Sequence, residues 1–172
     1  MVAPSGKLTA RAKAIAFLLL DVDGVLTDGT VTFTSDGHEV KSFHIHDGHG
    51  IKQLSRAGVE VGLLSGRNSS MVDRRAKELG IVEVHQGVEN KVVVFDALLA
   101  RRGLRDGQIA YVGDDLPDLP ILKRVGLAVV VRNGHDAIKR FAHYVTAKRG
   151  GEGAVREVTD LLLRAKGIRP TP

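Results

Sequence analysis

Residues 17–29 read FLLLDVDGVLTDG, and no other stretch of this chain constrains its fold as strongly. Four apolar residues run directly into Asp21, and Asp23 and Gly24 follow after one valine. An apolar run that ends in charge is typical of a buried parallel strand whose carboxyl end opens into a crevice, where α/β sheets bind ligands. Because two carboxylates so close together repel each other, we expect a cation between them. A hard divalent ion such as Mg²⁺ suits these oxygen ligands.

Strand and helix patterns alternate along the rest of the chain. A first strand (14–20) is followed by a hairpin signal (30–43). The pattern then predicts helix 50–57, strand 59–64, helix 68–79, strand 81–85, helix 91–102, strand 108–112, a helix from Pro117, strand 127–131, and helices 136–142 and 153–166. This order predicts an α/β fold, a three-layer doubly wound parallel sheet with a hairpin inserted after the first strand. We place one domain at residues 9–167, with flexible termini at 1–8 and 168–172.

Composition narrows the class of protein. With no cysteine among its 172 residues, the chain cannot have a disulfide framework or a thiolate metal site, which fits a reducing, cytoplasmic location. Its apolar runs are too short for a membrane span, so we expect no membrane association. The net charge of +5 favours a solvated basic surface and a small anionic substrate. Aromatic residues make up only 4%, too few for base stacking, so no nucleic-acid partner is expected.

Further polar groups come after later strands. Ser65 follows the apolar run 61–64, and Lys91 opens a helix after the strand 81–85. Asp114 and Asp115 follow the run 109–112, and Asp118 comes three residues later. Because the carboxyl ends of parallel strands meet at one edge of a sheet, these groups should form an acidic metal site beside a Ser/Lys phosphate site. This set favours a carboxylate nucleophile that forms an aspartyl-phosphate.

These groups resemble, in order and spacing, the four motifs of the haloacid dehalogenase (HAD) superfamily. The matching segments are 21–25 (DVDGV), Ser65, Lys91 and 113–115 (GDD). Further segments are similar to 3-deoxy-D-manno-octulosonate 8-phosphate (KDO 8-phosphate) phosphatases, namely 23–29 (DGVLTDG), 43–54 (FHIHDGHGIKQL), 64–67 (LSGR) and 150–158 (GGEGAVREV). The resemblance covers about residues 14–165 and implies a HAD-like Rossmannoid core of the branch without a cap domain.

The resemblance implies roles for the matching positions. Asp21 would be the nucleophile and a ligand of Mg²⁺. Asp23 would be the general acid/base, with its backbone carbonyl on the metal. Asp114 would complete the protein ligands of the metal. Asp115 and Asp118 would position Asp114 without binding the metal themselves.

The resemblance also implies how a sugar-acid phosphate would be held. Ser65 and Lys91 would bind its phosphate. The positions that would contact the rest of the substrate are Asp23, His44, Ile45, His46, Asp47, Gly48, Lys52, Gly66, Arg67 and Arg75. Related enzymes form homotetramers in which a neighbour closes the site with its hairpin, residues 30–43 here, and its C-terminal tail, residues 167–172 here.

The function implied is magnesium-dependent hydrolysis of KDO 8-phosphate to KDO and phosphate through an aspartyl-phosphate. A nonulosonate 9-phosphate, of the sialic-acid type, remains an alternative substrate, and the sequence leaves open whether Co²⁺ or Mn²⁺ can replace Mg²⁺. Two other classes stay open, a phospho-receiver domain and a non-catalytic HAD module. The cluster of His44, His46, Asp47 and His49 could also be read as a transition-metal site, but substrate contacts are favoured.

Overall fold

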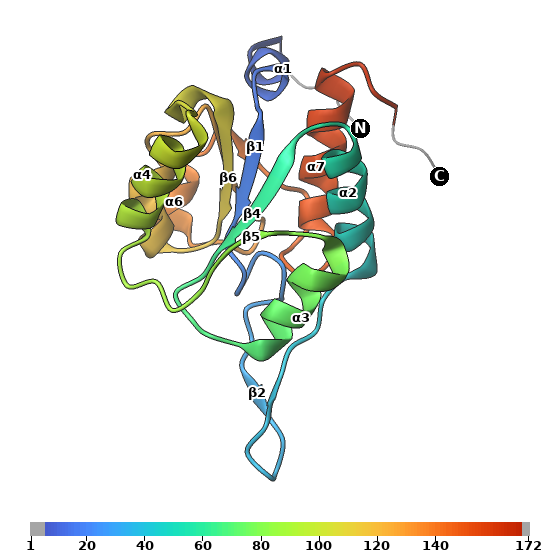
Figure 1. Ribbon diagram of the computed structural model, residues 1–172, viewed down its shortest axis with the longest axis vertical. Coiled ribbons are helices and arrows are strands. Elements are labelled where there is room, and N and C mark those ends of the chain that lie inside the picture. Colours follow the sequence, from blue (N-terminus) through green and yellow to red (C-terminus); the bar gives the residue numbers. More distant parts are fainter. Residues whose placement is uncertain (1–5, 170–172) are drawn as a thin grey trace.

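The computed structural model describes residues 6–169 and confirms the expected α/β fold. Six parallel strands form one sheet in the order β5-β4-β1-β6-β7-β8 (Figure 1). Their bounds are β1 Phe17–Leu20, β4 Glu60–Leu64, β5 Glu83–His85, β6 Ile109–Gly113, β7 Leu127–Val130 and β8 Tyr144–Val145. Since β1 lies between β4 and β6, the chain winds outward from β1 in both directions. The carboxyl end of β1 is therefore the point at which such folds form a ligand crevice.

Helices cover both faces of the sheet (Figure 1). One face packs against α1 (Gly6–Lys13), α2 (Ile45–Arg56), α3 (Ser70–Leu79) and α7 (Ala154–Ala165). The other packs against α4 (Lys91–Arg102), α5 (Leu119–Leu122) and α6 (Asp136–Lys139). Because side chains alternate along a strand, β1 serves both cores, with Leu18 and Leu20 in one and Phe17 and Leu19 in the other. This explains why β1 is apolar at every position.

A two-stranded antiparallel hairpin, β2 (Thr32–Phe33) and β3 (Glu39–Val40), leaves the chain between β1 and α2. It projects beyond the carboxyl edge of the sheet (Figure 1). Apolar side chains remain exposed on and near it, including Phe33 at 63%. Among residues 6–169, no helix combines the length and apolar character that a bilayer span requires.

The structure differs from the sequence pattern at several element boundaries. We expected a helix only from residue 50, but α2 begins at Ile45. The reason is the imidazole of His44, whose Nδ1 accepts a hydrogen bond from the His46 backbone N–H at 3.2 Å and caps the helix. The pattern also missed β8, which has only two residues.

The N-terminal boundary differs as well. We expected residues 1–8 to be a flexible terminus, but α1 begins at Gly6, and Leu8 packs against the core. The helix was missed because its sequence, GKLTARAK, is half polar and buries only Ala12, which leaves no clear apolar periodicity. Residues 1–5 and 170–172, the outer parts of the two expected termini, lie outside the described residues.

The loop before α7 holds the loop that follows β1. Gly151 donates its backbone N–H to the Val25 carbonyl at 3.1 Å, and Gly150 donates to Asn133 Oδ1 at 2.8 Å. A Cβ atom added to Gly150 would lie 1.7 Å from the Gly24 carbonyl oxygen. The glycines of residues 150–153 therefore allow two backbones to touch, which gives this segment a structural role as a turn before α7.

We predict that Gly150→Ala destabilises the fold by about 1–3 kcal/mol, since the added methyl group forces the loop after β1 to move. Urea unfolding monitored by circular dichroism measures the change. Gly107→Ala is a matched control, because a Cβ atom there meets nothing within 4 Å. Equal stability of the two variants would show that the close approach of the loops is not required.

Candidate active site

Three polar residues follow adjacent strands at the carboxyl edge of the sheet. Asp21 follows β1, Ser65 follows β4 and Asp114 follows β6. The register places Leu20, the last residue of β1, beside Leu63 and Val112. Asp21 continues this pairing, because its backbone N–H donates to the Val112 carbonyl at 3.0 Å. The sheet thus brings residues from three separate parts of the sequence to one place.

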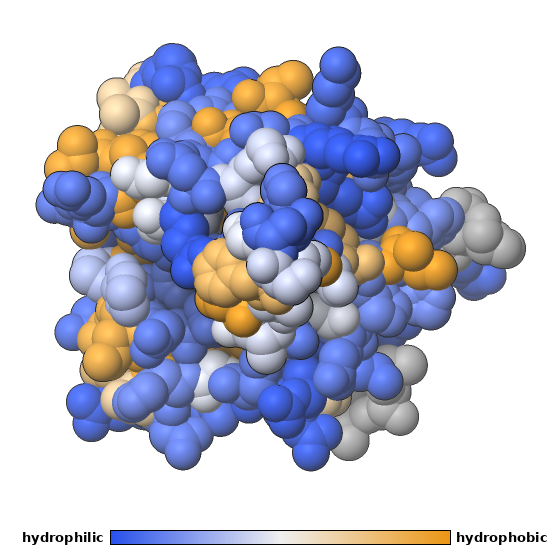
Figure 2. All heavy atoms as spheres, turned by 90° about the horizontal axis from the view of Figure 1, so that it is seen from below, coloured by the Kyte–Doolittle hydropathy of each residue, from blue (hydrophilic) through white to orange (hydrophobic). Residues whose placement is uncertain are grey.

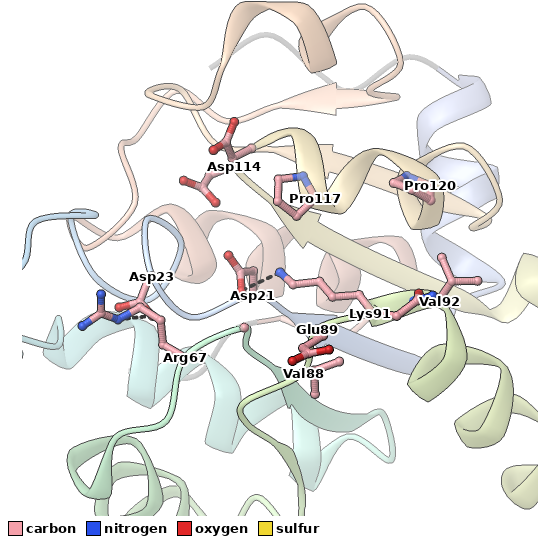
Figure 3. A pocket seen from close by; sticks show the side chains of 13 residues that line it. Asp21, Asp23, Arg67, Val88, Glu89, Lys91, Val92, Asp114, Pro117 and Pro120 are labelled. Atoms are coloured by element: carbon pink, nitrogen blue, oxygen red, sulfur yellow. Dashed lines mark hydrogen bonds and ion pairs between the residues drawn. The ribbon is translucent and has the colours of Figure 1, made fainter.

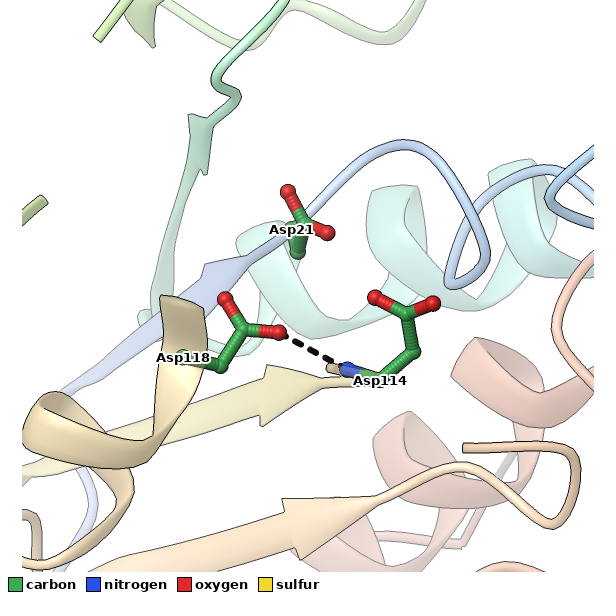
Figure 4. A group of neighbouring side chains, drawn as sticks. All are labelled: Asp21, Asp114 and Asp118. Carbon is green, nitrogen blue, oxygen red and sulfur yellow. Dashed lines mark hydrogen bonds between the residues drawn. The ribbon is translucent and has the colours of Figure 1, made fainter. Parts of the chain in front are cut away.

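Asp21 and Asp114 form an acidic cluster with Asp118 (Figure 4). One carboxylate oxygen from each lies within 4.8 Å of the others. Among the described residues, these three are the group of potential metal ligands whose donor atoms come this close together. The four-residue group of His44, His46, Asp47 and His49 does not form a comparable cluster there.

Asp118 differs from the other two members because its oxygens already have protein donors. Its Oδ1 accepts from Lys91 Nζ at 2.7 Å and from the Tyr111 hydroxyl at 2.6 Å. Its Oδ2 accepts from the backbone N–H groups of Asp114 at 2.8 Å and Asp115 at 3.2 Å. Asp118 therefore fixes the loop after β6, and Asp21 and Asp114 are left as the carboxylates that can hold a cation.

Lys91 links the acidic cluster to the start of α4. Its Nζ donates to Asp21 Oδ1 at 2.9 Å and to Asp118 Oδ1 at 2.7 Å, and its side chain is only 8% exposed. Burial alone would lower the pKa of Lys91, but the two carboxylates outweigh it and raise that pKa. Lys91 is therefore a permanent positive charge beside Asp21.

Burial also raises the pKa values of the two candidate cation ligands, Asp21 and Asp114. It raises the pKa of Asp21 to about 6, although the charge of Lys91 opposes the rise. Burial and the negative charges of Asp21 and Asp118 raise the pKa of Asp114 to about 8. Two carboxylates that resist ionisation together favour a divalent cation as a third partner.

Two glycines make this close approach possible. Gly24 has a φ of +90°, and a Cβ atom there would lie 2.1 Å from Asp114 Oδ2. A Cβ atom on Gly113 would lie 2.4 Å from Asp118 Oδ2. Any larger side chain at either position would push an acidic group away, so both glycines are part of the site's geometry.

A cavity of about 600 Å³ lies over the cluster (Figure 3). Seven of the residues that sequence analysis proposed line it, namely Asp21, Asp23, Gly66, Arg67, Lys91, Asp114 and Asp115. The sequence pattern did not indicate six further lining residues, namely Val88, Glu89, Asn90, Val92, Pro117 and Pro120. Most of these residues lie next to Lys91 in sequence. Because Lys91 was expected at the site, its sequence neighbours could have been expected there as well.

Asp23 lies at the side of the cavity next to Arg67 (Figure 3), with its side chain 24% exposed. Its Oδ2 lies 3.9 Å from Arg67 Nε, and its Oδ1 accepts a hydrogen bond from Lys41 Nζ. Ser65 is buried, and its hydroxyl oxygen accepts from the Arg67 backbone N–H at 3.2 Å. The sequence did not indicate Lys41, because nothing in the hairpin pattern shows which way its side chain turns.

The other proposed substrate contacts do not line the cavity of one chain. They are His44, Ile45, His46, Asp47, Gly48, Lys52 and Arg75. Asp47 is 1% exposed and turns toward α7, where its Oδ1 accepts from the Arg156 backbone N–H at 2.7 Å. Arg75 pairs with Glu78 at 3.3 Å, and the absence of a side chain on Gly48 leaves room for it. The start of α2 is therefore a separate cluster.

The geometry permits one type of chemistry above others. A buried carboxylate, Asp21, is held by a lysine and lies beside a second carboxylate, Asp114, at a cavity open to solvent. A cation between the carboxylates, together with Lys91, would offset the charge of a phosphate, so an anionic nucleophile could attack an anionic group. Asp23 is near enough to the cavity to exchange protons with water or a leaving group.

Comparisons with known proteins agree with this chemistry. Residues 80–158 match the family model of haloacid dehalogenase-like hydrolases. The chain is 44% identical to the 3-deoxy-D-manno-octulosonate 8-phosphate phosphatase KdsC of Escherichia coli K12 over 163 residues, which cover 95% of this chain and 87% of that protein.

Solved structures show the same likeness. A probable YrbI family phosphatase from Pseudomonas syringae superposes with a TM-score of 0.93 at 50% identity, covering 95% of this chain and 93% of that one. The KDO 8-phosphate phosphatase of Moraxella catarrhalis, solved with a magnesium ion, a phosphate ion and KDO, gives a TM-score of 0.92 at 41% identity, covering 94% and 92%.

We predict that Mg²⁺ stabilises the protein more at pH 8 than at pH 5. The pKa values of Asp21 (about 6) and Asp114 (about 8) lie above the ordinary 3.8, so the metal-free fold binds more protons than the unfolded chain. Its stability should fall as pH rises from about 4 through about 8, and Mg²⁺ should restore it by replacing those protons. At 100 times Kd the gain is about 2.7 kcal/mol.

Thermal melting with MgCl₂ or with a chelator, at both pH values, measures this effect. The pKa of Glu83 is shifted in the opposite direction. Burial raises this pKa, but hydrogen bonds from Arg102 and Arg101 outweigh burial and lower it to about 2. The stability that Glu83 contributes is lost only below its ordinary 4.5, outside the range tested. The control Asp114→Asn should reduce both the pH slope and the effect of Mg²⁺. An equal Mg²⁺ effect at both pH values would contradict the assignment.

Proposed function

The chain belongs to the haloacid dehalogenase-like hydrolases, in the family of KDO 8-phosphate phosphatases, and on this premise we propose that it hydrolyses KDO 8-phosphate to KDO and phosphate. The observation that carries the proposal is the convergence of Asp21, Lys91 and Asp114 on one cavity in a chain so similar to these enzymes. A cytoplasmic location remains our expectation from the cysteine-free composition.

We propose Mg²⁺ as the cofactor, held by the carboxylates of Asp21 and Asp114 and by the backbone carbonyl of Asp23. The donors fit, because all three are hard oxygen ligands and the two carboxylates otherwise repel each other. When bound, the ion supplies positive charge that neutralises phosphoryl oxygens.

The protein's own groups account for the remaining steps. An oxygen of Asp21 attacks phosphorus, and the bond between phosphorus and the sugar oxygen breaks. Asp23 donates a proton to the leaving sugar oxygen, which leaves an aspartyl-phosphate on Asp21. Asp23 then takes a proton from water, whose oxygen attacks phosphorus, and the bond to Asp21 breaks to release phosphate.

Lys91 and Ser65 are proposed to hold the phosphate during both steps. Lys91 already points at Asp21 Oδ1, so a phosphoryl group on Asp21 would lie beside its charge. Asp118 positions Lys91, and Tyr111, buried against the same oxygen, supports Asp118. Gly66 and Arg67 line the cavity on the side of Asp23 and are proposed to contact the sugar acid.

We also propose that the protein works as a homotetramer, without a cap domain. The hairpin region exposes Val31 at 47%, Phe33 at 63%, Val40 at 42% and Ile45 at 75%. Figure 2, seen from the hairpin end, shows apolar atoms near the centre of this face. A neighbour packed here would cover them and could bring substrate-binding groups to the cavity, including those at the start of α2. Closure by the tail 167–172 stays a prediction, since residues 170–172 lie outside the described residues.

A phosphate-release screen with Mg²⁺ tests the substrate. It compares KDO 8-phosphate, nonulosonate 9-phosphates and simple hexose phosphates by kcat/KM. We expect KDO 8-phosphate to be hydrolysed best. A preference for nonulosonate 9-phosphates would replace the substrate but keep the chemistry, and equal activity on hexose phosphates would overturn sugar-acid specificity.

We predict that Asp21→Asn lowers phosphate release by at least about 10³-fold, because an amide cannot act as the nucleophile. The melting temperature should not fall, since the variant removes a buried carboxylate whose pKa is raised. Asp136→Asn, at a carboxylate that is 94% exposed, is the matched control and should keep full activity. Substantial turnover by Asp21→Asn would assign the nucleophile elsewhere.

We predict that Phe33→Glu reduces the assembly to smaller species and lowers activity, because a charge replaces an apolar contact between subunits. Light scattering coupled to gel filtration measures the mass. Val82→Glu, at a valine 85% exposed in a different part of the chain, should leave the mass unchanged. If both variants keep the wild-type mass, the hairpin is not the interface.

A further inference from the structure

Asp23, the proposed general acid/base, is held by groups that come from outside its own loop. Lys41, which follows β3, donates a hydrogen bond from Nζ to Asp23 Oδ1. Asp23 Oδ2 lies 3.9 Å from Arg67 Nε, which is beyond hydrogen-bond distance. Lys41 thus occupies one oxygen of the carboxylate, and the other faces the cavity side with Arg67 (Figure 3).

The burial of Lys41 is unusual for a lysine on a projecting hairpin. Its side chain is only 2% exposed, so its ammonium group has left water. A buried cation is tolerated only when negative groups compensate for the lost hydration. Asp23 provides one such group, and Glu39 Oε1, at 3.5 Å from Lys41 Nζ, provides another.

Glu39 extends this pairing to Arg67. Its Oε1 accepts from Arg67 Nη2 at 2.6 Å, and its side chain is 15% exposed. The contacts run from Asp23 to Lys41, to Glu39, to Arg67 and back toward Asp23. We call these four residues the hairpin charge ring. Two carboxylates alternate with two cations, so no charge in the ring is left unbalanced.

We propose that Lys41 is a positioning residue for the reaction: it orients the carboxylate of Asp23 for proton transfer to the leaving oxygen, and Glu39 holds Lys41 in place. The proposal rests on the acid/base role of Asp23 in the proposed function. A general acid must lie within hydrogen-bond reach of its partner, and a misplacement of about 1 Å can cost about 10²-fold in rate. Because Lys41 and Glu39 belong to the hairpin region, efficient proton transfer by Asp23 also requires the hairpin to lie in this position.

Aryl phosphates separate this role from a structural one. Phenyl phosphate and p-nitrophenyl phosphate have nearly the same shape, but the phenoxide leaving group is the stronger base and needs a proton more. The value of kcat/KM reports the transfer of the phosphoryl group from the ester to Asp21. This is the step in which Asp23 protonates the leaving group. We expect Lys41→Met to lose about 10²-fold with phenyl phosphate and only a few-fold with p-nitrophenyl phosphate.

Further variants complete the experiment. Lys41→Arg should restore most of the activity on phenyl phosphate, because it returns a cation to the ring. Asp23→Asn should show the same difference between substrates and sets its upper limit. Glu39→Gln, which keeps the shape of the side chain, should show a smaller difference and serves if Lys41→Met does not fold. Lys139→Met, at a lysine paired with Asp136 away from the cavity, is the control.

An equal loss of kcat/KM on both aryl phosphates, or a loss confined to sugar-acid phosphates, would overturn the proposal in favour of a structural or a substrate-binding role for Lys41. The expected difference in a protein that does not hydrolyse KDO 8-phosphate would support the inference and reject only the proposed substrate. No phosphate release from any ester by the wild-type protein would reject the proposed function itself, and the inference with it.

Discussion

The repulsion between Asp21 and Asp114, both held at the carboxyl edge of the sheet, is the constraint on which the rest of the site depends. Burial makes the repulsion stronger, and it raises the pKa of both groups. The protein offsets part of it with Lys91, and the remainder favours a divalent cation. A site built in this way is incomplete without positive charge, which is also what a bound phosphate requires.

Backbone geometry keeps this unfavourable pair together. Asp114 and Asp115 donate their backbone N–H groups to Asp118, which prevents the loop after β6 from moving away. Because Gly150 has no side chain, the backbone of the turn before α7 contacts the loop after β1 at Gly24. The stability of the fold, mostly in the two cores beside the sheet, therefore maintains a site that electrostatics alone would open.

The hairpin has two connections with different consequences. On its outside, apolar side chains such as Phe33 are exposed, as expected for a surface that meets another subunit. On its inside, Glu39 and Lys41 reach Arg67 and Asp23. Lys41 directly follows β3 and its Nζ lies 3.5 Å from Glu39 Oε1, so the two charges lie on the same side of the hairpin. Assembly at the hairpin and proton transfer at Asp23 would in this way depend on one segment.

The sequence by itself determined the order of most strands and helices, apart from α1 and β8, and the carboxylates of the site. Apolar runs that end in Asp21, Ser65 and Asp114 are local signals, and parallel strands bring such ends together. Only the tertiary structure decided that Asp118 is saturated by donors, that residues 45–48 are helical, and that Lys41 is buried against Asp23. The physical reason is that these outcomes depend on side-chain directions and on contacts between residues distant in the chain, which local periodicity does not encode.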